Sequence, residues 1–305
     1  MLKSRLHLKA KGHMGSPAVS LVLCTRNRAE RLNICLEYVA RQDPSCSWEL
    51  VVVDNGSTDD TGKVLSEYAA KVSFPTQILY EGRPGKSRGL NHALRVARGD
   101  IIAFIDDDCY VASDYIDRVR EIFEDPKIGF AGGRVDLFDP TDYPMSIWTS
   151  TEPALLAPRS YLQSGLLPGG NMMLRRQVLD AIGGFDPELG PGARFASGED
   201  PDLQARASFA GWWGLYAPTV VVAHHHHRKA KDALAWRRSY SIGTGAYKAK
   251  FLLISEARSL YLRNWYWTFW CVLGGRYALR DLLWELQGAA GYLAHRLRKR
   301  IPDAR

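Results

Sequence analysis

The chain has 305 residues, 46% of them hydrophobic and 24% charged, the balance of a globular protein with a sizeable core. No run reaches the roughly 20 apolar residues of a membrane-spanning helix, which argues against an integral membrane protein. The net charge of +7 favours phosphates, nucleic acid or an anionic membrane as a partner.

The cysteines and the N-terminal segment bear on the compartment. Five scattered cysteines, odd in number, lack the spacing of metal ligands. The basic segment 1–13 contains no apolar stretch of the kind that secretory signals carry. We therefore expect a protein of the reducing cytoplasm.

Short apolar runs alternate with helical patterns over the first 108 residues. Strands are expected at 19–25, 48–54, 76–80 and 100–108, and a helix follows each of the first three. Because the strands are apolar along their whole length, they predict a parallel sheet with both faces covered. Ligands of such sheets bind beyond the carboxyl ends of the strands. Those ends carry Thr25, Asn27, Asp54, Asp106, Asp107 and Asp108. We expect a nucleotide-binding half, although the G-x-G-x-x-G motif of dinucleotide folds is missing.

The second half of the chain is less regular. A strand is expected at 128–138, then an irregular stretch to about residue 167. A turn, strand and helix follow at 167–186, a Gly-rich loop and helix at 190–211, and a strand at 214–227 that ends in four histidines.

Three adjacent carboxylates, Asp106 to Asp108, end the fourth expected strand. Like charges this close raise one another's pKa unless a cation lies among them, and a divalent ion with oxygen ligands would provide it. In an extended segment Asp106 and Asp108 would share a face. The alternative is a solvated acidic turn that caps the next helix.

The histidine run, residues 224–227, is a second candidate for metal binding. Imidazole together with carboxylate suits an ion such as Mn²⁺ or Mg²⁺. Side chains alternate along an extended chain, so at most one or two of the four can face one site. The alternative is a polar, basic surface loop.

Two further motifs have both structural and functional interpretations. Asp200 before Pro201 predicts an N-cap followed by proline at the first helical position; alternatively, one of the two carboxylates, Glu199 or Asp200, is a general base at a helix start. Lys86 and Arg88 follow a Gly-rich loop that opens a helix, where a diphosphate could bind; the alternative is a solvated loop.

Taken in order, the motifs CTRNRAERL, VVVDNGSTDDT, GKSRGLNHAL, GDIIAFIDDD, GGNMMLRR, GGFD, GED and YAPTVVVAHHHH closely resemble the family 2 glycosyltransferases. The resemblance covers about residues 18–250. It implies an α/β fold of the GT-A type, a Rossmann-like mixed sheet flanked by helices, with a C-terminal helical extension. The catalytic domain would span 18–230, divided into a nucleotide-binding half (18–108) and an acceptor-binding half (109–230), followed by a helical region at 231–305.

The resemblance also implies an activity and a site. A sugar would move with inversion from a nucleotide-diphosphate sugar to a hydroxyl of a saccharide or lipid-linked acceptor. The residues implied in nucleotide binding are Thr25, Asn27, Asp54, Lys86, Asp106 and Asp107. Those implied at the floor where donor sugar and acceptor meet are Gly169, Gly170 and Asn171. Asp108 would bind Mn²⁺ or Mg²⁺ with a histidine, His224 as first choice and His226 as second. Asp200 would be the base, with Glu199 beside it. The stretches 134–168 and 190–198 would set specificity.

The C-terminal tail suggests a membrane contact. Residues 264–275 are uncharged and rich in Trp, Tyr and Phe, but too few to span a bilayer. A leucine stripe and a basic end follow, the stripe being Leu279, Leu282, Leu283 and Leu286. We expect peripheral association with the inner face of the cell membrane and, by family analogy, a role in cell-surface polysaccharide or glycolipid biosynthesis. The alternatives are packing on the catalytic domain or a dimer contact.

Other functions fit the sequence less well. A sugar nucleotidyltransferase would carry a Gly-rich loop directly after the first strand, where LCTRNRAERL has no glycine. A basic nucleic-acid-binding protein would explain the net charge, but the acidic cluster would repel a phosphate backbone. We expect no nucleic acid partner.

Overall fold

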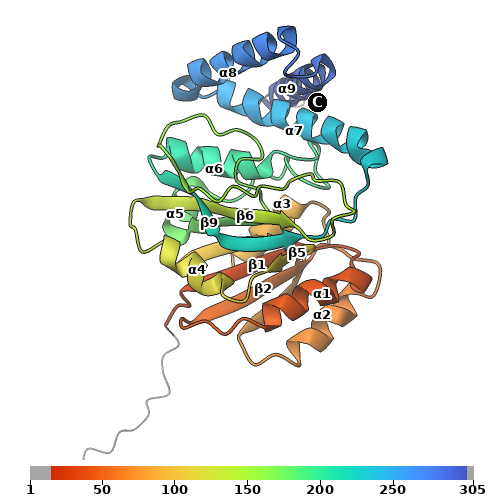
Figure 1. Cartoon of the computed structure of the whole chain (residues 1–305), viewed down its shortest axis with the longest axis vertical. Helices are drawn as coiled ribbons and strands as arrows, with labels where there is room; N and C mark the ends of the chain where they lie inside the picture. Colours follow the sequence, from red (N-terminus) through yellow and green to blue (C-terminus); the bar gives the residue numbers. More distant parts are fainter. Residues whose placement is uncertain (1–14, 301–305) are drawn as a thin grey trace, which may run out of the picture.

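The structure is a computed structural model that describes residues 15–300 (Figure 1). The expectations for segment 1–13 and for the last five residues lie outside the described part. Its strands are β1 Val19–Thr25, β2 Trp48–Asp54, β3 Thr76–Tyr80, β4 Ile101–Asp106, β5 Cys109–Val111, β6 Ile128–Leu137, β7 Ala154–Leu156, β8 Asn171–Arg175 and β9 Trp213–His224. Its α-helices are α1 Ala29–Ala40, α2 Thr61–Ala69, α3 Lys86–Leu94, α4 Tyr115–Ile122, α5 Arg176–Ile182, α6 Glu199–Phe209, α7 Ala233–Leu252, α8 Ser255–Leu273 and α9 Leu279–Arg300.

The described strands form one nine-stranded sheet, in the order β3-β2-β1-β4-β8-β6-β9-β5, with β7 paired to β9. The first four strands are parallel, as predicted. β8 runs antiparallel to both β4 and β6, β6 and β9 are parallel, and β5 is antiparallel to β9. The mixed α/β sheet predicted from the sequence is therefore confirmed.

Both faces of the sheet are buried, and β1 shows how. Leu21 and Leu23 pack into one core with Leu36 of α1. Val22, between them, points the other way into a second core with Leu90 of α3. Since side chains alternate along a strand, a continuously apolar strand supplies both cores. Figure 1 shows α1 and α2 on one side of the sheet and α6 on the other.

The C-terminal helices form an outer layer beyond α6 (Figure 1). α7 and α9 approach through two glycines: a Cβ at Gly245 would collide with the backbone of Glu285, and one at Gly288 with that of Ile242. Tyr247 of α7 joins the second core of the sheet. This helix therefore packs on the catalytic domain, the alternative kept open from the sequence. The division at residue 230 stays a prediction.

The leucine stripe expected in the tail is mostly exposed. Of its four members only Leu282 is buried. None of the described helices is long and apolar enough to cross a membrane.

Candidate active site

A cleft of about 1060 Å³ runs from the carboxyl ends of β1 and β4 to the C-terminal helices. Most of the predicted site residues line it, namely Thr25, Lys86, Asp106, Asp107, Asp108, Gly169, Gly170, Glu199, Asp200 and His224. The predicted specificity stretches also contribute, through residues 143–147, 163–168 and 196–198. The structure thus brings the two halves of the chain to one cavity.

The three adjacent aspartates have three different partners. Asp106 forms an ion pair with Lys86. Asp107 accepts a hydrogen bond from the Thr25 hydroxyl at 2.6 Å, and Asp108 lies 3.2 Å from His224 Nε2. The expectation of one shared face for Asp106 and Asp108 assumed extended backbone and is wrong, because β4 ends at Asp106 and the next two residues form a turn.

We define the predicted donor end of the cleft by Asp106, Asp107, Asp108 and His224, and the pKa values of Asp107 and Asp108 are shifted there. Burial and the neighbouring Asp108 raise the pKa of Asp107. Burial also acts on Asp108, but the His224 hydrogen bond and charge outweigh it and hold the pKa of that carboxyl below its ordinary value. The sequence analysis missed Arg28, whose guanidinium lies 3.6 Å from Asp107 and 4.0 Å from Asp108. The basic "TRNR" segment after β1 was the available signal.

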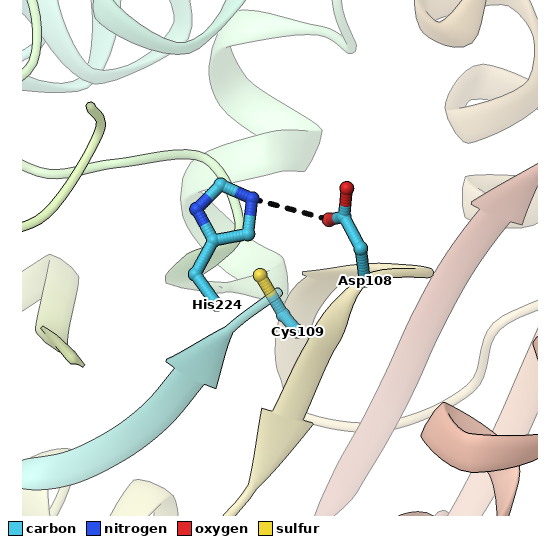
Figure 2. Close-up of side chains that lie close together, drawn as sticks. All are labelled: Asp108, Cys109 and His224. Atoms are coloured by element: carbon cyan, nitrogen blue, oxygen red, sulfur yellow. Dashed lines mark ion pairs between the residues drawn. The ribbon is translucent and has the colours of Figure 1, made fainter. Parts of the chain in front are cut away.

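His224 reaches Asp108 because β5 and β9 pair antiparallel with Cys109 opposite His224 (Figure 2). Its Nδ1 is buried without a hydrogen-bond partner. Cys109 completes a group whose possible ligand atoms lie within 4.8 Å. Burial raises the pKa of the Cys109 thiol well above its ordinary value, and a thiolate suits softer metals than Mn²⁺ or Mg²⁺. One imidazole and one carboxylate remain, a donor set that fits Mn²⁺ or Mg²⁺.

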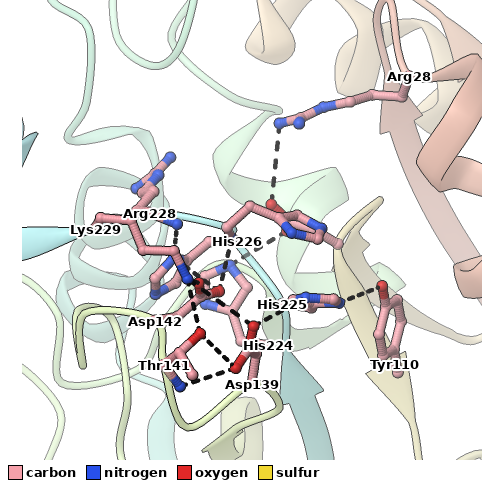
Figure 3. Close-up of polar contacts among 12 residues, drawn as sticks. Arg28, Tyr110, Asp139, Thr141, Asp142, His224, His225, His226, Arg228 and Lys229 are labelled. Atoms are coloured by element: carbon pink, nitrogen blue, oxygen red, sulfur yellow. Dashed lines mark hydrogen bonds and ion pairs between the residues drawn. The ribbon is translucent and has the colours of Figure 1, made fainter.

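The other three histidines of the run contact Tyr110, Asp139, Asp142 and Arg228, a network that we call the clasp. Figure 3 shows its polar contacts together with His224 and Arg28. β9 ends at His224, short of the predicted residue 227. His225 Nδ1 lies 3.1 Å from the Tyr110 hydroxyl. His226 lies 3.7 Å from Asp142, and burial together with His224 lowers its pKa. Its Nε2 is buried and has no hydrogen-bond partner, so His226 stays a second candidate ligand.

Asp139, Asp142 and His225 form a further group of possible metal ligands in the described residues. Protein partners already account for its carboxylates. Lys229 Nζ donates to Asp142 at 2.8 Å, and Thr141 donates to Asp139 through both its backbone N–H and its hydroxyl. These contacts hold the loop after β9 against the loop after β6.

The candidate base lies at the start of α6, but not at its cap. The helix begins at Glu199 after Gly198, which has a φ of 99°, so Asp200 is the second helical residue and the N-cap prediction is wrong. The Gly169 N–H donates to Asp200 Oδ2 at 3.1 Å. A side chain at position 169 would collide with this carboxylate, which explains glycine there.

Burial is the largest influence on the pKa values of Glu199, Asp200 and Lys86. It raises the pKa of Glu199, with the Asp200 charge adding to the effect and Lys86 opposing it. It likewise raises the pKa of Asp200, against the pull of Lys86. For Lys86, burial would lower the pKa, but Asp106, Asp200 and Glu199 together raise it well above its ordinary value. Lys86 is therefore a firmly protonated cation among these carboxylates.

Four predicted residues lie outside the cleft lining, namely His226, Asn171, Asn27 and Asp54. Asn171 is fully buried, donates to the carbonyls of Arg134 and Val220, and so ties β8 to its neighbours beneath the cleft. Asn27 accepts a hydrogen bond from the Thr58 N–H, and Asp54 accepts one from the Ser57 N–H. Their predicted binding roles stay predictions. The lining residue from that region is Asn55, which the sequence analysis missed.

Comparisons with known proteins identify the family of the chain. Residues 20–183 match the family model described as glycosyl transferase family 2. The chain is 24% identical to glycosyltransferase AglE of Haloferax volcanii, over 82% of this chain and 80% of that protein. It is 30% identical to a beta-monoglucosyldiacylglycerol synthase of a Nostoc species, over 56% of this chain but only 38% of that longer protein.

Solved structures resemble the fold over almost the whole chain. A mannosyltransferase from Pyrobaculum calidifontis, PcManGT, in complex with GDP-Man and Mn²⁺, superposes with a TM-score of 0.62 at 22% identity, over 93% of this chain and 76% of that one. S. aureus TarS 1-349 in complex with UDP-GlcNAc gives 0.61 at 17% identity, over 90% and 80%. Because the family model covers more than half of the 305 residues, the chain belongs to glycosyl transferase family 2 and is a glycosyltransferase of the GT-A fold.

Proposed function

We propose that the protein is a metal-dependent, inverting glycosyltransferase. It transfers a sugar from a nucleotide-diphosphate sugar to a hydroxyl of a saccharide or lipid-linked acceptor, in cell-surface polysaccharide or glycolipid biosynthesis. The observation that carries the proposal is one cleft lined by the buried Asp108–His224 pair and by Asp200, a carboxylate whose burial raises its pKa.

Asp108 and His224 would hold the divalent ion. His224 Nε2 faces the Asp108 carboxylate at 3.2 Å, and the lowered pKa keeps Asp108 ionised, so this pair suits a cation. When bound, such an ion supplies Lewis-acid and electrostatic stabilisation to a departing diphosphate. The Mn²⁺ in the PcManGT complex supports this choice of ion.

Lys86 would bind the donor diphosphate. It is the first residue of α3, directly after Gly85, and both line the cleft. The backbone N–H groups at a helix start, with the partial positive charge of that end, attract phosphate. The ammonium of Lys86 adds a full charge there, since its pKa is raised. The nucleotide-sugar complexes of PcManGT and TarS support this donor class.

Asp200 would act as the general base. It removes the proton from the acceptor hydroxyl as the hydroxyl attacks the anomeric carbon opposite the departing diphosphate. A raised pKa improves a carboxylate as a base near neutral pH. Glu199 is more deeply buried, so it would keep its proton and leave a single charge on Asp200. The Gly169 N–H orients the Asp200 carboxylate.

The C-terminal helices would contact an anionic bilayer at the inner face of the cell membrane. We define the aromatic face as the exposed residues Leu262, Tyr266, Trp267, Phe269, Trp270 and Leu273 of α8. Within 253–298, Glu256 is the one exposed acidic residue, whereas the exposed basic residues are Arg258, Arg263, Arg276, Arg280, Arg296 and Arg298. Interfacial aromatic rings together with arginines suit an anionic lipid surface.

The donor proposal is tested by thermal stability with UDP, GDP, dTDP and CMP, each with Mn²⁺ and with EDTA. A ligand that binds the folded state raises the unfolding temperature. We expect one diphosphate nucleotide to stabilise the protein in a Mn²⁺-dependent manner. No stabilisation by any nucleotide would overturn the transferase mechanism.

The membrane proposal is tested separately by co-sedimentation with vesicles of phosphatidylglycerol and phosphatidylcholine. We expect binding to the anionic vesicles that falls with added salt. The double substitution Trp267→Ser and Trp270→Ser should weaken it, and Leu234→Ser, at an exposed position of α7, should not. Equal binding of all three proteins would contradict the aromatic face as the contact.

A further inference from the structure

The cleft continues past Asp200 into the C-terminal helices, where its lining changes character. Residues of three helices line this helical end, which we define by Arg237 and Lys248 of α7, Asn264 and Thr268 of α8, and Asp281 and Glu285 of α9. We propose that the helical end is the acceptor subsite and that it binds a neutral, hydroxyl-rich group, the saccharide end of the acceptor. This inference rests on the proposed transferase function.

Three charged side chains are buried at the helical end. Burying them costs free energy, and packing the three helices together does not require it. Lys248, Asp281 and Glu285 are each only 3% exposed. Glu285 accepts hydrogen bonds from Lys248 Nζ at 2.7 Å, the Tyr277 hydroxyl at 2.7 Å and Trp265 Nε1 at 3.0 Å. Burying charges is unfavourable unless they are paired, and apolar side chains would fasten helices as well.

Several polar atoms at the helical end keep unused hydrogen-bonding capacity. Lys248 Nζ donates to Glu285 alone among the described residues, which leaves two N–H groups. Asp281 Oδ1 and Asn264 Oδ1 are buried without a hydrogen bond, although Arg280 Nε lies 3.8 Å from the former. Lys248, Asn264 and Asp281 all line the same cleft, so residues with donors and acceptors surround one space. Hydroxyl groups, which both donate and accept, are the matching ligand.

The charges of the helical end balance, which argues for a neutral ligand. Lys248 pairs with Glu285, and Arg237 pairs with Asp281. A phosphate would meet two carboxylates there and no unpaired arginine or lysine in either pair. Two aromatic side chains flank the space, Tyr240 at 38% and Trp267 at 59% exposure. Their rings offer the apolar faces of a sugar a surface to pack on.

The helical end also lies next to the candidate base. Ser197, three residues before Asp200, donates to the carbonyls of Ser239 and Tyr240 on α7. A Cβ at Gly243 would collide with Ser197, so glycine permits this close approach. An acceptor held by α7, α8 and α9 would therefore present its hydroxyl on the side of Asp200 away from the donor carboxylates.

The experiment measures binding of simple sugars to the full chain loaded with the diamagnetic Mg²⁺ and the nucleotide diphosphate that stabilises it. The probes are the methyl glycosides of glucose, galactose, mannose and N-acetylglucosamine, followed by saturation-transfer NMR. They lack an alkyl chain, so they do not report lipid binding by the aromatic face, whose member Trp267 also lines the cleft. The variants are Asn264→Leu, which removes an unpartnered acceptor, and Thr268→Trp, which fills the space. Ser259→Leu, at an exposed position of α8 outside the cleft lining, is the matched control.

We expect at least one glycoside to bind, Asn264→Leu to weaken it about fivefold through one lost hydrogen bond, and Thr268→Trp to abolish it. Asn264→Leu should keep or raise the unfolding temperature, since it removes an unsatisfied buried atom; a purely structural asparagine would lower it. If no glycoside binds, or if both cleft variants bind as Ser259→Leu does, the acceptor subsite is overturned and the donor proposal stands. If the nucleotide itself fails to bind the wild-type chain, the proposed function fails first.

Discussion

The two ends of the cleft bury charges in opposite ways. At the donor end and beside it, the carboxylates outnumber Lys86 and Arg28, and they are Asp106, Asp107, Asp108, Glu199 and Asp200. At the helical end each carboxylate has its own cation, Lys248 with Glu285 and Arg237 with Asp281. An excess of negative charge marks a place where an added cation is stabilising, whereas a balanced set leaves room for a neutral ligand.

The largest expected effect tests whether Asp200, rather than Glu199, is the general base. Asp200→Asn should lower the transfer rate by about 10²–10⁴-fold, the usual contribution of a general base, while nucleotide affinity stays close to that of the wild type. Glu199→Gln should retain most of the rate, because glutamine resembles the protonated acid. Initial rates with donor and acceptor measure both. Normal turnover by the Asn variant would show that another group takes the proton.

The second prediction concerns the balance of charge at the helical end. Lys248→Met should lower the free energy of unfolding by about 3–5 kcal/mol, because it leaves Glu285 buried and unpaired. Adding Glu285→Gln should recover much of this loss. Urea denaturation of the single and double variants measures it. Arg118→Ala, which removes exposed ion pairs of α4, is the control and should cost at most about 1 kcal/mol. If Lys248→Met and Arg118→Ala lowered the free energy of unfolding equally, the importance of the buried Lys248–Glu285 pair would be contradicted.

At the donor end, Asp108→Asn should weaken Mn²⁺-dependent nucleotide binding by at least about tenfold, since even indirect partners of metal ligands contribute that much. Calorimetry with Mn²⁺ and with EDTA separates the metal-dependent part. Asp139→Asn, in the clasp beside His225, is the matched control and should leave the metal dependence intact. If Asp139→Asn lost the Mn²⁺ dependence and Asp108→Asn kept it, the metal site would instead be the group of Asp139, Asp142 and His225.

The smallest expected effects are opposite pH dependences of the transfer rate and of the free energy of unfolding. Since the pKa of Asp200 is raised, transfer should slow as the pH falls through that pKa and level off above it. Glu199 and Asp200 bind protons more tightly in the folded state, so the free energy of unfolding should fall as the pH rises from their ordinary pKa to the raised one. Rate and denaturation profiles at several pH values measure both. Asp200→Asn should flatten the acidic limb of the rate profile.

The parallel half of the sheet could be predicted because its cause is local. Continuously apolar strands such as β2 can be stable only with both faces covered. The start of α6 could not be predicted from local sequence in the same way. Gly198 adopts a left-handed φ of 99°, which moves the helix start beyond the aspartate–proline pair. A conformation imposed by the packing of Ser197 against α7 has no trace in the adjacent sequence.

Parts of the candidate site could likewise be predicted from local sequence, and other parts could not. The motifs identified Asp108 and a histidine, but the pairing with His224 depends on the register of β5, a strand of three residues. The helical end was not foreseen, because Lys248 and Glu285 are 37 residues apart and each is an ordinary surface residue by type. Only the close approach of α7 and α9 at Gly245 and Gly288 brings them together.

Helix α8 faces two environments at once. Asn264, Thr268 and Cys271 line the cleft, while Tyr266, Phe269 and their neighbours in the aromatic face are exposed. If that face lies on a bilayer, the enzyme searches for a lipid-linked acceptor by diffusion in two dimensions. Turnover would then follow the surface density of the acceptor rather than its bulk concentration, because confinement to one surface raises the effective concentration of the reactants. Diluting the acceptor with inert lipid would slow the reaction even when the total amount of acceptor is unchanged.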